Sequence, residues 1–326
     1  MPTPPSCRAL IGGLMVLIGL FSPLSPACAQ CLSFLRSWSG TASGSGQINS
    51  PSGIAADQAG FVYVLDQLTN SLHRFSPDGT PLQAWTCGSS VFPGPYGLCI
   101  DPNGVLYVAD PAKNLVQKFS TSGTSLGSWG VTRPVGVAAD RFGNVFVADS
   151  QNQRIQKFTS SGAFLGSWNA TGTSAGPINN AEGIAVDQDG FVYVCDRGNH
   201  RVVKFTNDGV FVTAWYGSAS YPFGGGQPNG IAVGPDGHVF TSETLSWNRV
   251  QEFTSNGDFV CLVGVPPGGN TPAQFEQPIA VACDPTGNVF VADRTSNVDK
   301  PRVFTFGPLP TSVSATSWGR IKTLYR

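Results

Sequence analysis

Two residues in the second half of the chain, Glu182 and Asn229, have side chains that could hold a cation, and each directly precedes a glycine. A carboxylate and an amide oxygen suit a hard cation such as calcium. The residue at the same place in four other segments differs each time, and such variation on a fixed frame is where ligand specificity would reside. In chain order the six residues are Ser52, Tyr96, Val135, Glu182, Asn229 and Ile279.

Other catalytic and metal-binding patterns do not emerge from the sequence. The three histidines, His73, His200 and His238, fall at different phases of the repeat described below, so they are not expected to converge on a zinc ion. No Gly-x-Ser-x-Gly elbow is present. No pair of cysteines has the CxxC spacing of zinc-thiolate or redox sites. The sequence therefore predicts no catalytic residue.

A repeated segment positions the six variable residues. Its copies begin directly after them, at Gly53, Gly97, Gly136, Gly183, Gly230 and Ala280. Thirteen residues after each start comes an acid, in chain order Asp66, Asp110, Asp149, Asp196, Glu243 and Asp293. Between these marks the apolar runs are short and bounded by turn residues, which predicts four strands per copy. Six such copies predict an all-β fold, a six-bladed β-propeller of four-stranded blades.

The two ends of the repeated region are complementary. The sixth copy loses the pattern after Phe306, before its fourth strand, whereas residues 31–38 match the last part of a copy without the preceding strands. We therefore expect the N-terminal strand to complete the last blade and to remove an exposed sheet edge. The propeller is expected to span residues 30–306, with the six variable residues at one mouth of its central channel.

The recurring acids have arginine partners in four copies only. Arg154, Arg201, Arg249 and Arg302 begin the third strand of copies three to six, where they can pair with the acid. Ser71 and Leu115 replace arginine in the first two copies, which leaves Asp66 and Asp110 as acids without that partner. These two are open either to a functional role or to capping of a turn.

Tryptophans recur at the end of the fourth strand, at Trp85, Trp129, Trp168 and Trp215. Large aromatic side chains at one fixed place could form a ligand cage. We expect them instead to pack between neighbouring blades, because burial is their commoner role.

The chain termini differ from the repeats. Residues 1–29 carry one charge, Arg8, followed by an apolar run and Ala27-Cys28-Ala29, which predicts a cleaved signal peptide. The apolar run is shorter than the roughly 20 residues that span a bilayer. We expect an exported, secreted protein, periplasmic or extracellular, with no transmembrane anchor after cleavage. Residues 307–326 are predicted to be a Pro/Ser/Thr linker and a basic, aromatic tail that either frays or docks.

The amino-acid composition limits the kinds of partner that the chain can bind. With 19 basic and 20 acidic side chains the chain is nearly neutral, which disfavours nucleic-acid binding. Six cysteines lie outside the signal peptide, and an oxidising compartment would allow some to pair. The pairs worth testing are Cys87 with Cys99 and Cys261 with Cys283, because each pair straddles one loop between copies. We expect a monomer.

The repeated residues resemble the NHL repeat. Its pattern of P-x-G-I-A-V-D, D-x-x-G, V-Y-V-A-D and N-x-R-I-x-K-F is closely matched by Pro134 to Phe158 and by Gly183 to Phe205. The resemblance extends over about Cys31 to Phe306 and implies the propeller fold. It does not specify a function, because such propellers serve as scaffolds, receptors, RNA binders and enzymes.

The chain is also similar to regucalcin-type gluconolactonases, propellers that hold a divalent ion at the channel mouth. Glu182 and Asn229 match two of the three ligands that this resemblance implies, and Ile279 replaces the third. The resemblance therefore implies a metal-dependent lactonase or lyase, with calcium as its cofactor, as an alternative function.

We predict an exported, non-catalytic binding or scaffold propeller without a cofactor, which recognises a protein, peptide or glycan partner on its rim. Tyr96 and Trp247 are the expected contacts, with the loops around residues 221–227 and 264–274. The sequence favours binding over catalysis without deciding between them.

Overall fold

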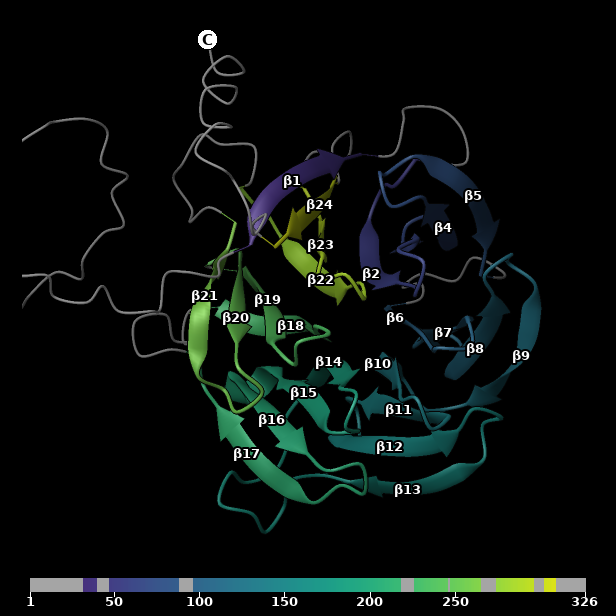
Figure 1. Cartoon of the computed structure of the whole chain (residues 1–326). Helices are drawn as coiled ribbons and strands as arrows, with labels where there is room; N and C mark the ends of the chain where they lie inside the picture. Colours follow the sequence, from purple (N-terminus) through teal and green to yellow (C-terminus); the bar gives the residue numbers. More distant parts are fainter. Residues whose placement is uncertain are drawn as a thin grey trace, which may run out of the picture.

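The computed structural model describes residues 32–39, 47–87, 96–217, 226–245, 247–264, 274–295 and 302–308. Six four-stranded antiparallel sheets form a ring of blades around a central axis (Figure 1), which confirms the predicted six-bladed β-propeller. The proposed signal peptide, residues 1–29, and most of the C-terminal segment lie outside the described residues. No helix in the described part of the chain is long and apolar enough to span a bilayer.

In blades one to five the strands follow sequence order from the axis outward, and in blade six the N-terminal strand of the chain lies outside the three C-terminal strands. Blades one and two contain β2 (Pro51–Ala56), β3 (Val62–Asp66), β4 (Ser71–Phe75), β5 (Pro81–Thr86), β6 (Gly97–Ile100), β7 (Val105–Asp110), β8 (Leu115–Ser120) and β9 (Ser125–Gly130). Blades three and four contain β10 (Pro134–Ala139), β11 (Asn144–Asp149), β12 (Arg154–Thr159), β13 (Phe164–Trp168), β14 (Ala181–Val186), β15 (Val192–Asp196), the short 3-10 helix η2 (Arg197–Asn199), β16 (Arg201–Phe205) and β17 (Phe211–Trp215). Blades five and six contain β18 (Gly226–Val233), β19 (Val239–Leu245), β20 (Arg249–Phe253), β21 (Phe259–Val263), β22 (Pro278–Cys283), β23 (Val289–Asp293), β24 (Arg302–Gly307) and β1 (Ser33–Trp38).

The Asp-x-x-Gly turn joins the first two strands of a blade. In blade four, Asp187 Oδ1 accepts hydrogen bonds from the backbone of Asp189 at 3.0 Å and of Phe191 at 2.8 Å. The other oxygen, Oδ2, accepts the hydroxyl proton of Tyr193 at 2.9 Å. Gly190 has a φ of 89°, a left-handed conformation that favours glycine. The turn residues thus fix the hairpin, and β15 returns antiparallel to β14 as a fully buried strand.

Burial follows position in the blade. All five residues of β3, β15 and β23 are buried, because neighbouring blades cover both faces of these second strands. The outer strands β9 and β13 are mostly exposed. The core is therefore a set of apolar layers between blades and not one central cluster.

Tryptophans lock five of the six joints between blades, which confirms their expected packing role. Each indole lies against the turn glycine of the next blade, where the Cβ of any larger residue would overlap the ring. The pairs are Trp38 with Gly79, Trp85 with Gly123, Trp129 with Gly162, Trp168 with Gly209 and Trp215 with Gly257. At the joint between blades five and six, the last residue of the outer strand is Val263.

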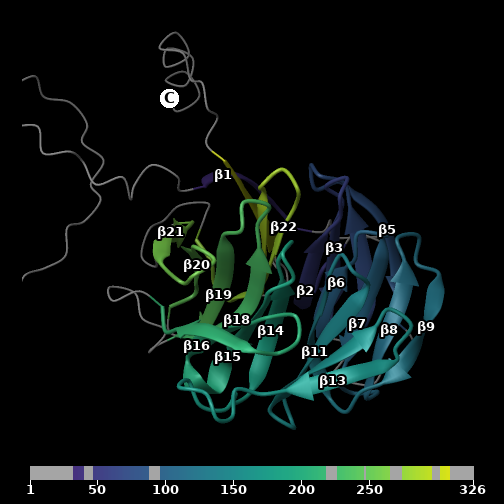
Figure 2. The ribbon, with the colours of Figure 1, turned by 60° about the horizontal axis from the view of Figure 1, so that its bottom comes forward.

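The N-terminal strand closes the ring as predicted. β1 pairs antiparallel with β24 and forms the outer strand of the last blade (Figures 1 and 2). Phe34 packs against Phe306 with ring centroids 5.9 Å apart, and Trp38 reaches Phe290 at 6.2 Å. Because of this pairing, β24 is not left as a sheet edge.

The cysteine pairs suggested by the sequence are not bridged. Among the described residues, Cys87, Cys99, Cys195, Cys261 and Cys283 form no disulfide with one another. Cys87 packs in the layer between blades one and two, whereas Cys99 faces the layer between blades two and three, so the sheet separates them. The Cys261 thiol instead donates to Glu252 Oε2 at 3.3 Å. Cys31 lies outside the described residues.

We predict that Trp38→Ala lowers the free energy of unfolding by about 3 kcal/mol, because it removes the aromatic contact that joins the last blade to the first. Chemical denaturation monitored by fluorescence measures the change. Arg36→Ala, an exposed position on the same strand, is the control and should change the value by less than about 0.5 kcal/mol. Equal stabilities of the Trp38 variant and the wild type would contradict the closure described above.

Candidate ligand-binding site at the channel mouth

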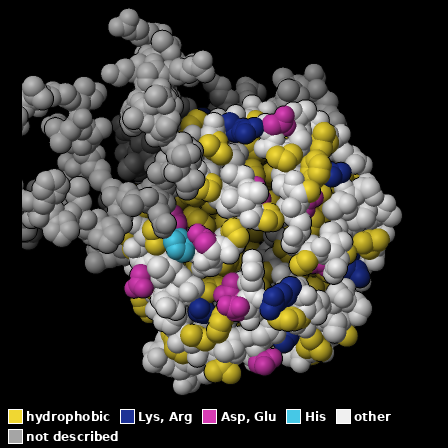
Figure 3. Space-filling model, in the orientation of Figure 1, with side chains coloured by type: hydrophobic (Ala, Val, Ile, Leu, Met, Phe, Trp, Pro, Cys, Tyr) yellow, Lys and Arg dark blue, Asp and Glu magenta, His cyan; other side chains and the backbone are white. Residues whose placement is uncertain are grey.

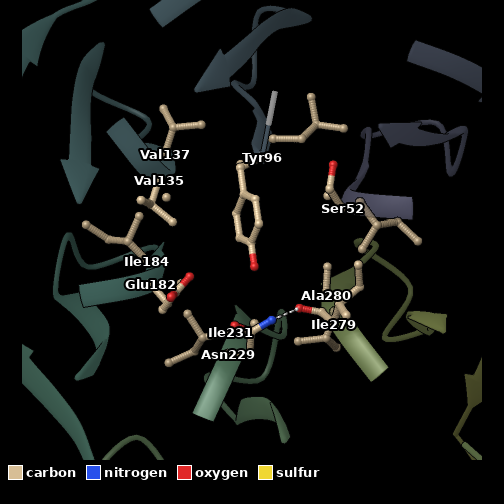
Figure 4. Close-up of a pocket in the computed structure, with 18 residues that line it drawn as sticks. Ser52, Tyr96, Val135, Val137, Glu182, Ile184, Asn229, Ile231, Ile279 and Ala280 are labelled. Carbon is tan, nitrogen blue, oxygen red and sulfur yellow. Dashed lines mark hydrogen bonds between the residues drawn. The ribbon is translucent and has the colours of Figure 1, made fainter. Parts of the chain in front are cut away.

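The six variable residues meet at one mouth of the central channel (Figure 4), and we call them the mouth ring. Each precedes the glycine or alanine of an inner strand, and all inner strands begin at the same end of the ring. The cavity between them has a volume of about 60 Å³. A second layer of side chains continues the wall and is wholly aliphatic: Ile54, Leu98, Val137, Ile184, Ile231 and Val281. The mouth is therefore narrow, with polar groups above an apolar wall.

The repeat glycines explain how close the inner strands come. A Cβ at Gly136 would overlap the carbonyl oxygen of Glu182 in the next blade, and one at Gly183 would overlap that of Asn229. Only glycine tolerates such an approach of one backbone to another. The glycine therefore sets the width of the mouth, while the residue before it is free to vary.

Glu182 on β14 is the buried acid of the mouth ring. Its Oε1 accepts a hydrogen bond from Arg197 Nη1 at 2.9 Å, and the residue is 8% exposed. Its Oε2 is shielded from solvent and has no hydrogen-bond partner among the described residues, and the same holds for Arg197 Nε. Burial raises the pKa of the Glu182 carboxyl, while Arg197 and the side chain of Asn180 act in the opposite direction. The ion pair thus leaves one acceptor and one donor unused.

Tyr96 and Asn229 cross the mouth from two other blades. The Asn229 amide Nδ2 donates to the carbonyl oxygen of Ile279 at 2.9 Å, which fixes the amide orientation. The Tyr96 hydroxyl interacts with the Asn229 side chain, and Figure 4 shows the phenol ring standing across the opening. Burial is the main cause that raises the Tyr96 pKa, and the nearby Glu182 raises it further. Tyr96 therefore covers the centre of the mouth.

The rest of the mouth ring offers few metal ligands. Ser52 donates its hydroxyl proton to Leu65 O at 3.4 Å, and Val135 and Ile279 are aliphatic. The sequence placed Glu182 and Asn229 together correctly, but Arg197 occupies one carboxylate oxygen. In the described ranges no group of three or more His, Cys, Asp or Glu side chains gathers as metal ligands. A calcium ion, which usually takes six to eight oxygens, would find two side-chain ligands here.

The recurring acids lie at the same end of the blades, and the four expected arginine pairs form. The distances are 2.9 Å for Arg154 with Asp149, 2.6 Å for Arg201 with Asp196, 3.0 Å for Arg249 with Glu243 and 3.7 Å for Arg302 with Asp293. These acids are almost fully buried. Their role is structural, because each holds the start of the third strand against the inner strands.

Asp66 and Asp110 lack the arginine partner, as expected, but Asp110 is not an unpaired acid, because a lysine takes the place of the arginine. Lys113 Nζ lies 3.5 Å from its Oδ2, and Gln117 donates to the same oxygen at 2.9 Å. Asp66 accepts backbone hydrogen bonds, including one from Asn49 at 2.7 Å and one from Leu68 at 2.9 Å. Both acids cap loops, and their carboxylates are engaged within the chain.

The histidines lie on three different blades. His73 Nε2 is 2.7 Å from Ser71 Oγ in blade one, and His200 has a left-handed φ of 54° at the end of η2. In blade five, Glu252 lies between His238 Nδ1, at 2.5 Å, and the Cys261 thiol, at 3.3 Å. The Glu252 carboxylate contacts both the imidazole and the thiol and lies between them, so His238 is not placed to take the thiol proton.

Sequence reasoning missed two arginines that follow the acids of blades four and six. Arg197 pairs with Glu182, as described, and Arg294 Nη2 donates to Pro51 O at 3.1 Å and to Gln67 Oε1 at 3.2 Å, across to blade one. Arg294 also acts on the Tyr96 hydroxyl electrostatically. The available signal was a basic residue directly after the acid, which occurs only in these two copies.

The opposite end of the channel holds a larger cavity of about 500 Å³, lined by the Asp-x-x-Gly turns. Its carboxylates, such as Asp101 and Asp187, are used to hold the turns. On the face of the molecule drawn in Figure 3, acidic and basic side chains are interspersed, with no large patch of one charge sign. This end has the regular features of the repeat and lacks the blade-specific polar groups of the mouth ring.

Comparisons with known proteins identify the repeat and the fold. A sequence model of the NHL repeat matches residues 132–158 and 179–205. No curated protein has a significantly similar sequence. Among solved structures, a streptogramin B lyase has 15% identity and a TM-score of 0.60, with 84% of this chain and 98% of that chain covered. Virginiamycin B lyase from Staphylococcus aureus has 14% identity and a TM-score of 0.59, with coverage of 84% and 99%.

The WD40 repeats of RRP9 superpose equally well, at 9% identity and a TM-score of 0.60, with 86% of this chain and 99% of that chain covered. At these identities the similarity establishes the propeller fold and no activity.

The buried carboxyl of Asp293 predicts how the stability of the folded protein changes with pH. Burial raises its pKa from 3.8 to about 6, against the effect of the Glu276 and Gln277 amides. Because folding favours the protonated carboxyl, this group destabilises the protein progressively as the pH rises from about 4 to about 6. Asp293→Asn removes the ionisable carboxyl. Between pH 4 and pH 7 the wild type should therefore lose about 2 kcal/mol more stability than the variant.

Denaturation curves of both proteins across this pH range measure the difference. The slope with pH is the readout, since the substitution also weakens the amide contacts at every pH. Parallel pH profiles would contradict the raised pKa.

Proposed function

The chain is an NHL-repeat β-propeller, and from this premise we propose that it is an exported, non-catalytic binding propeller. Its partner, a protein, peptide or glycan, contacts the rim around the mouth ring. A single observation carries this proposal: Glu182 Oε2 is buried at the mouth without a hydrogen-bond partner among the described residues. A buried acceptor without a donor costs about 1–3 kcal/mol, and a ligand donor would recover that energy.

The chemistry of the described residues supports binding over catalysis. The thiol of Cys261 faces Glu252 and not His238, and the mouth itself contains no hydroxyl or thiol beside a histidine within the described ranges. The polar groups at the mouth differ from blade to blade, as expected for recognition of an asymmetric partner. The similar solved structures include lyases and a WD40 protein, so the fold is compatible with either function.

Site-specific photo-crosslinking tests the location of the contact. A photoreactive residue is placed at Gln153, which is exposed at the same end of the blades as the mouth ring, or at Gln188, which is exposed at the opposite end of the channel. In cells that produce the full chain, we expect discrete cross-linked products from position 153 and none from position 188. The products should disappear when Tyr96→Ala and Glu182→Ala are combined, because the polar centre of the contact is lost.

Circular dichroism and the melting temperature establish that the double variant is folded. Identical products from the two faces, or products that persist in the folded double variant, would refute the proposal.

A second candidate is a divalent-metal-dependent lactonase or lyase with its site at the same mouth. Glu182 and Asn229 favour it, because they lie on neighbouring blades and Glu182 has an unused oxygen. The charge of Arg197 beside the carboxylate opposes a divalent ion.

Calorimetric titration with calcium, magnesium and zinc separates the two functions. We expect no binding heat, because two side-chain ligands and an adjacent arginine make a poor cation site. Saturable heat that Glu182→Ala abolishes, together with hydrolysis of a lactone, would favour the enzyme.

A further inference from the structure

We infer that the mouth accepts an uncharged carboxamide, the side chain of an asparagine or glutamine that a protein partner inserts between Glu182 and Tyr96. This inference rests on the proposed binding function and specifies the group that the mouth recognises. Neither the NHL repeat match nor the similar structures specify such a group.

The hydrogen-bonding atoms without a partner indicate which chemical group a ligand must carry. Glu182 Oε2 requires a donor, and Arg197 Nε in the same ion pair requires an acceptor. Glu182 lines the mouth, and Arg197 is joined to it by a 2.9 Å hydrogen bond. A primary carboxamide carries two N–H donors and a carbonyl acceptor in one small group, so it can serve both kinds of atom.

The charges at the mouth oppose an ion. Glu182 and Arg197 cancel one another, Tyr96 and Asn229 are neutral, and Arg294 adds a positive charge close to Tyr96. An ammonium group would therefore meet two arginines, while a carboxylate would meet Glu182. Burial of an ammonium group beside two arginines is costly, and an uncharged amide loses much less solvation than a carboxylate does.

The size of the mouth selects a side chain over larger groups. A cavity of about 60 Å³ admits a group of only a few heavy atoms, while a sugar ring or a peptide backbone would remain outside. The aliphatic layer below the polar groups, which includes Val137, Ile184 and Ile231, offers no side-chain hydrogen-bond partner, so the inserted amide stops at the level of Glu182 and its methylene stem leads outward to the partner. This combination favours a protein partner over a glycan.

Tyr96 acts as a cover in the ligand-free protein. Its ring stands across the opening in Figure 4, and its hydroxyl interacts with Asn229, whose amide Nδ2 is engaged by Ile279. Rotation of this side chain opens the path to Glu182 and frees the Asn229 oxygen to accept from the incoming amide. Binding of the amide therefore requires this rotation of Tyr96.

A charge-matched set of small probes tests the inference. Propionamide, n-propylammonium and propionate have the same length and differ in charge. They are titrated into the full protein labelled at isoleucine and valine methyl groups, and NMR follows the methyl signals of Val135, Ile184 and Ile279. We expect saturable shifts with propionamide and no saturable shifts with the two ions.

Glu182→Gln should weaken propionamide binding roughly tenfold or more, because an amide donor then replaces or competes with the acceptor oxygen. Glu276→Gln, the same chemical change at a 49% exposed side chain on the same side of the ring, is the control and should leave the affinity unchanged. Preservation of the methyl spectrum away from the mouth establishes that both variants are folded.

The inference is overturned if no probe shifts the mouth methyl signals, or if either ion shifts them as strongly as propionamide. Failure of the probes while cross-linking at position 153 still depends on Glu182 would refute the carboxamide and leave the proposed function intact. Binding of propionamide while cross-linking is equal at both faces would refute the proposed function alone.

Discussion

The close approach of the six inner strands around the axis is the constraint on which the rest of the propeller depends. At Gly136 and Gly183 the neighbouring blade places a carbonyl oxygen where a Cβ would stand. The glycine hydrogen permits this contact, and the contact sets both the radius of the ring and the narrowness of its mouth. The outer tryptophans then fill the wedge that opens between blades with distance from the axis, as Trp168 does over Gly209.

This constraint distinguishes the positions that packing fixes from the positions that can determine ligand specificity. The glycine of an inner strand cannot vary freely, because the neighbouring blade is in contact with it, whereas the side chain of the residue before it faces the mouth of the channel. Glu182, Tyr96 and Asn229 occupy such places: Tyr96 and Asn229 interact across blades, and Glu182 pairs with Arg197 of its own blade. A regular frame of this kind lets one opening acquire a distinct set of polar groups without disturbing the core.

The sequence predicted the fold well because the fold depends on local, repeated signals. Asp187 and Gly190 specify a hairpin turn within four residues, and the incomplete sixth copy specified the closure by β1. The site was predicted only in outline. The pairing of Glu182 with Arg197 depends on the turn of η2, and the missing partner of Oε2 depends on packing around the mouth. Likewise, Lys113 reaches Asp110 through the path of a loop that the repeat pattern does not describe.

The pairing of β1 with β24 also constrains how the chain acquires its structure. The strands that seal the last blade come from opposite ends of the sequence, so Phe304 and Phe306 obtain their partner Phe34 only after the whole repeated region has been synthesised. Contacts of such long sequence separation slow folding, because the entropy of a very large loop is lost before the contact forms. The blades synthesised first therefore remain an unclosed arc until the last blade is made. Closure of the ring is a step that separates synthesis from the native state.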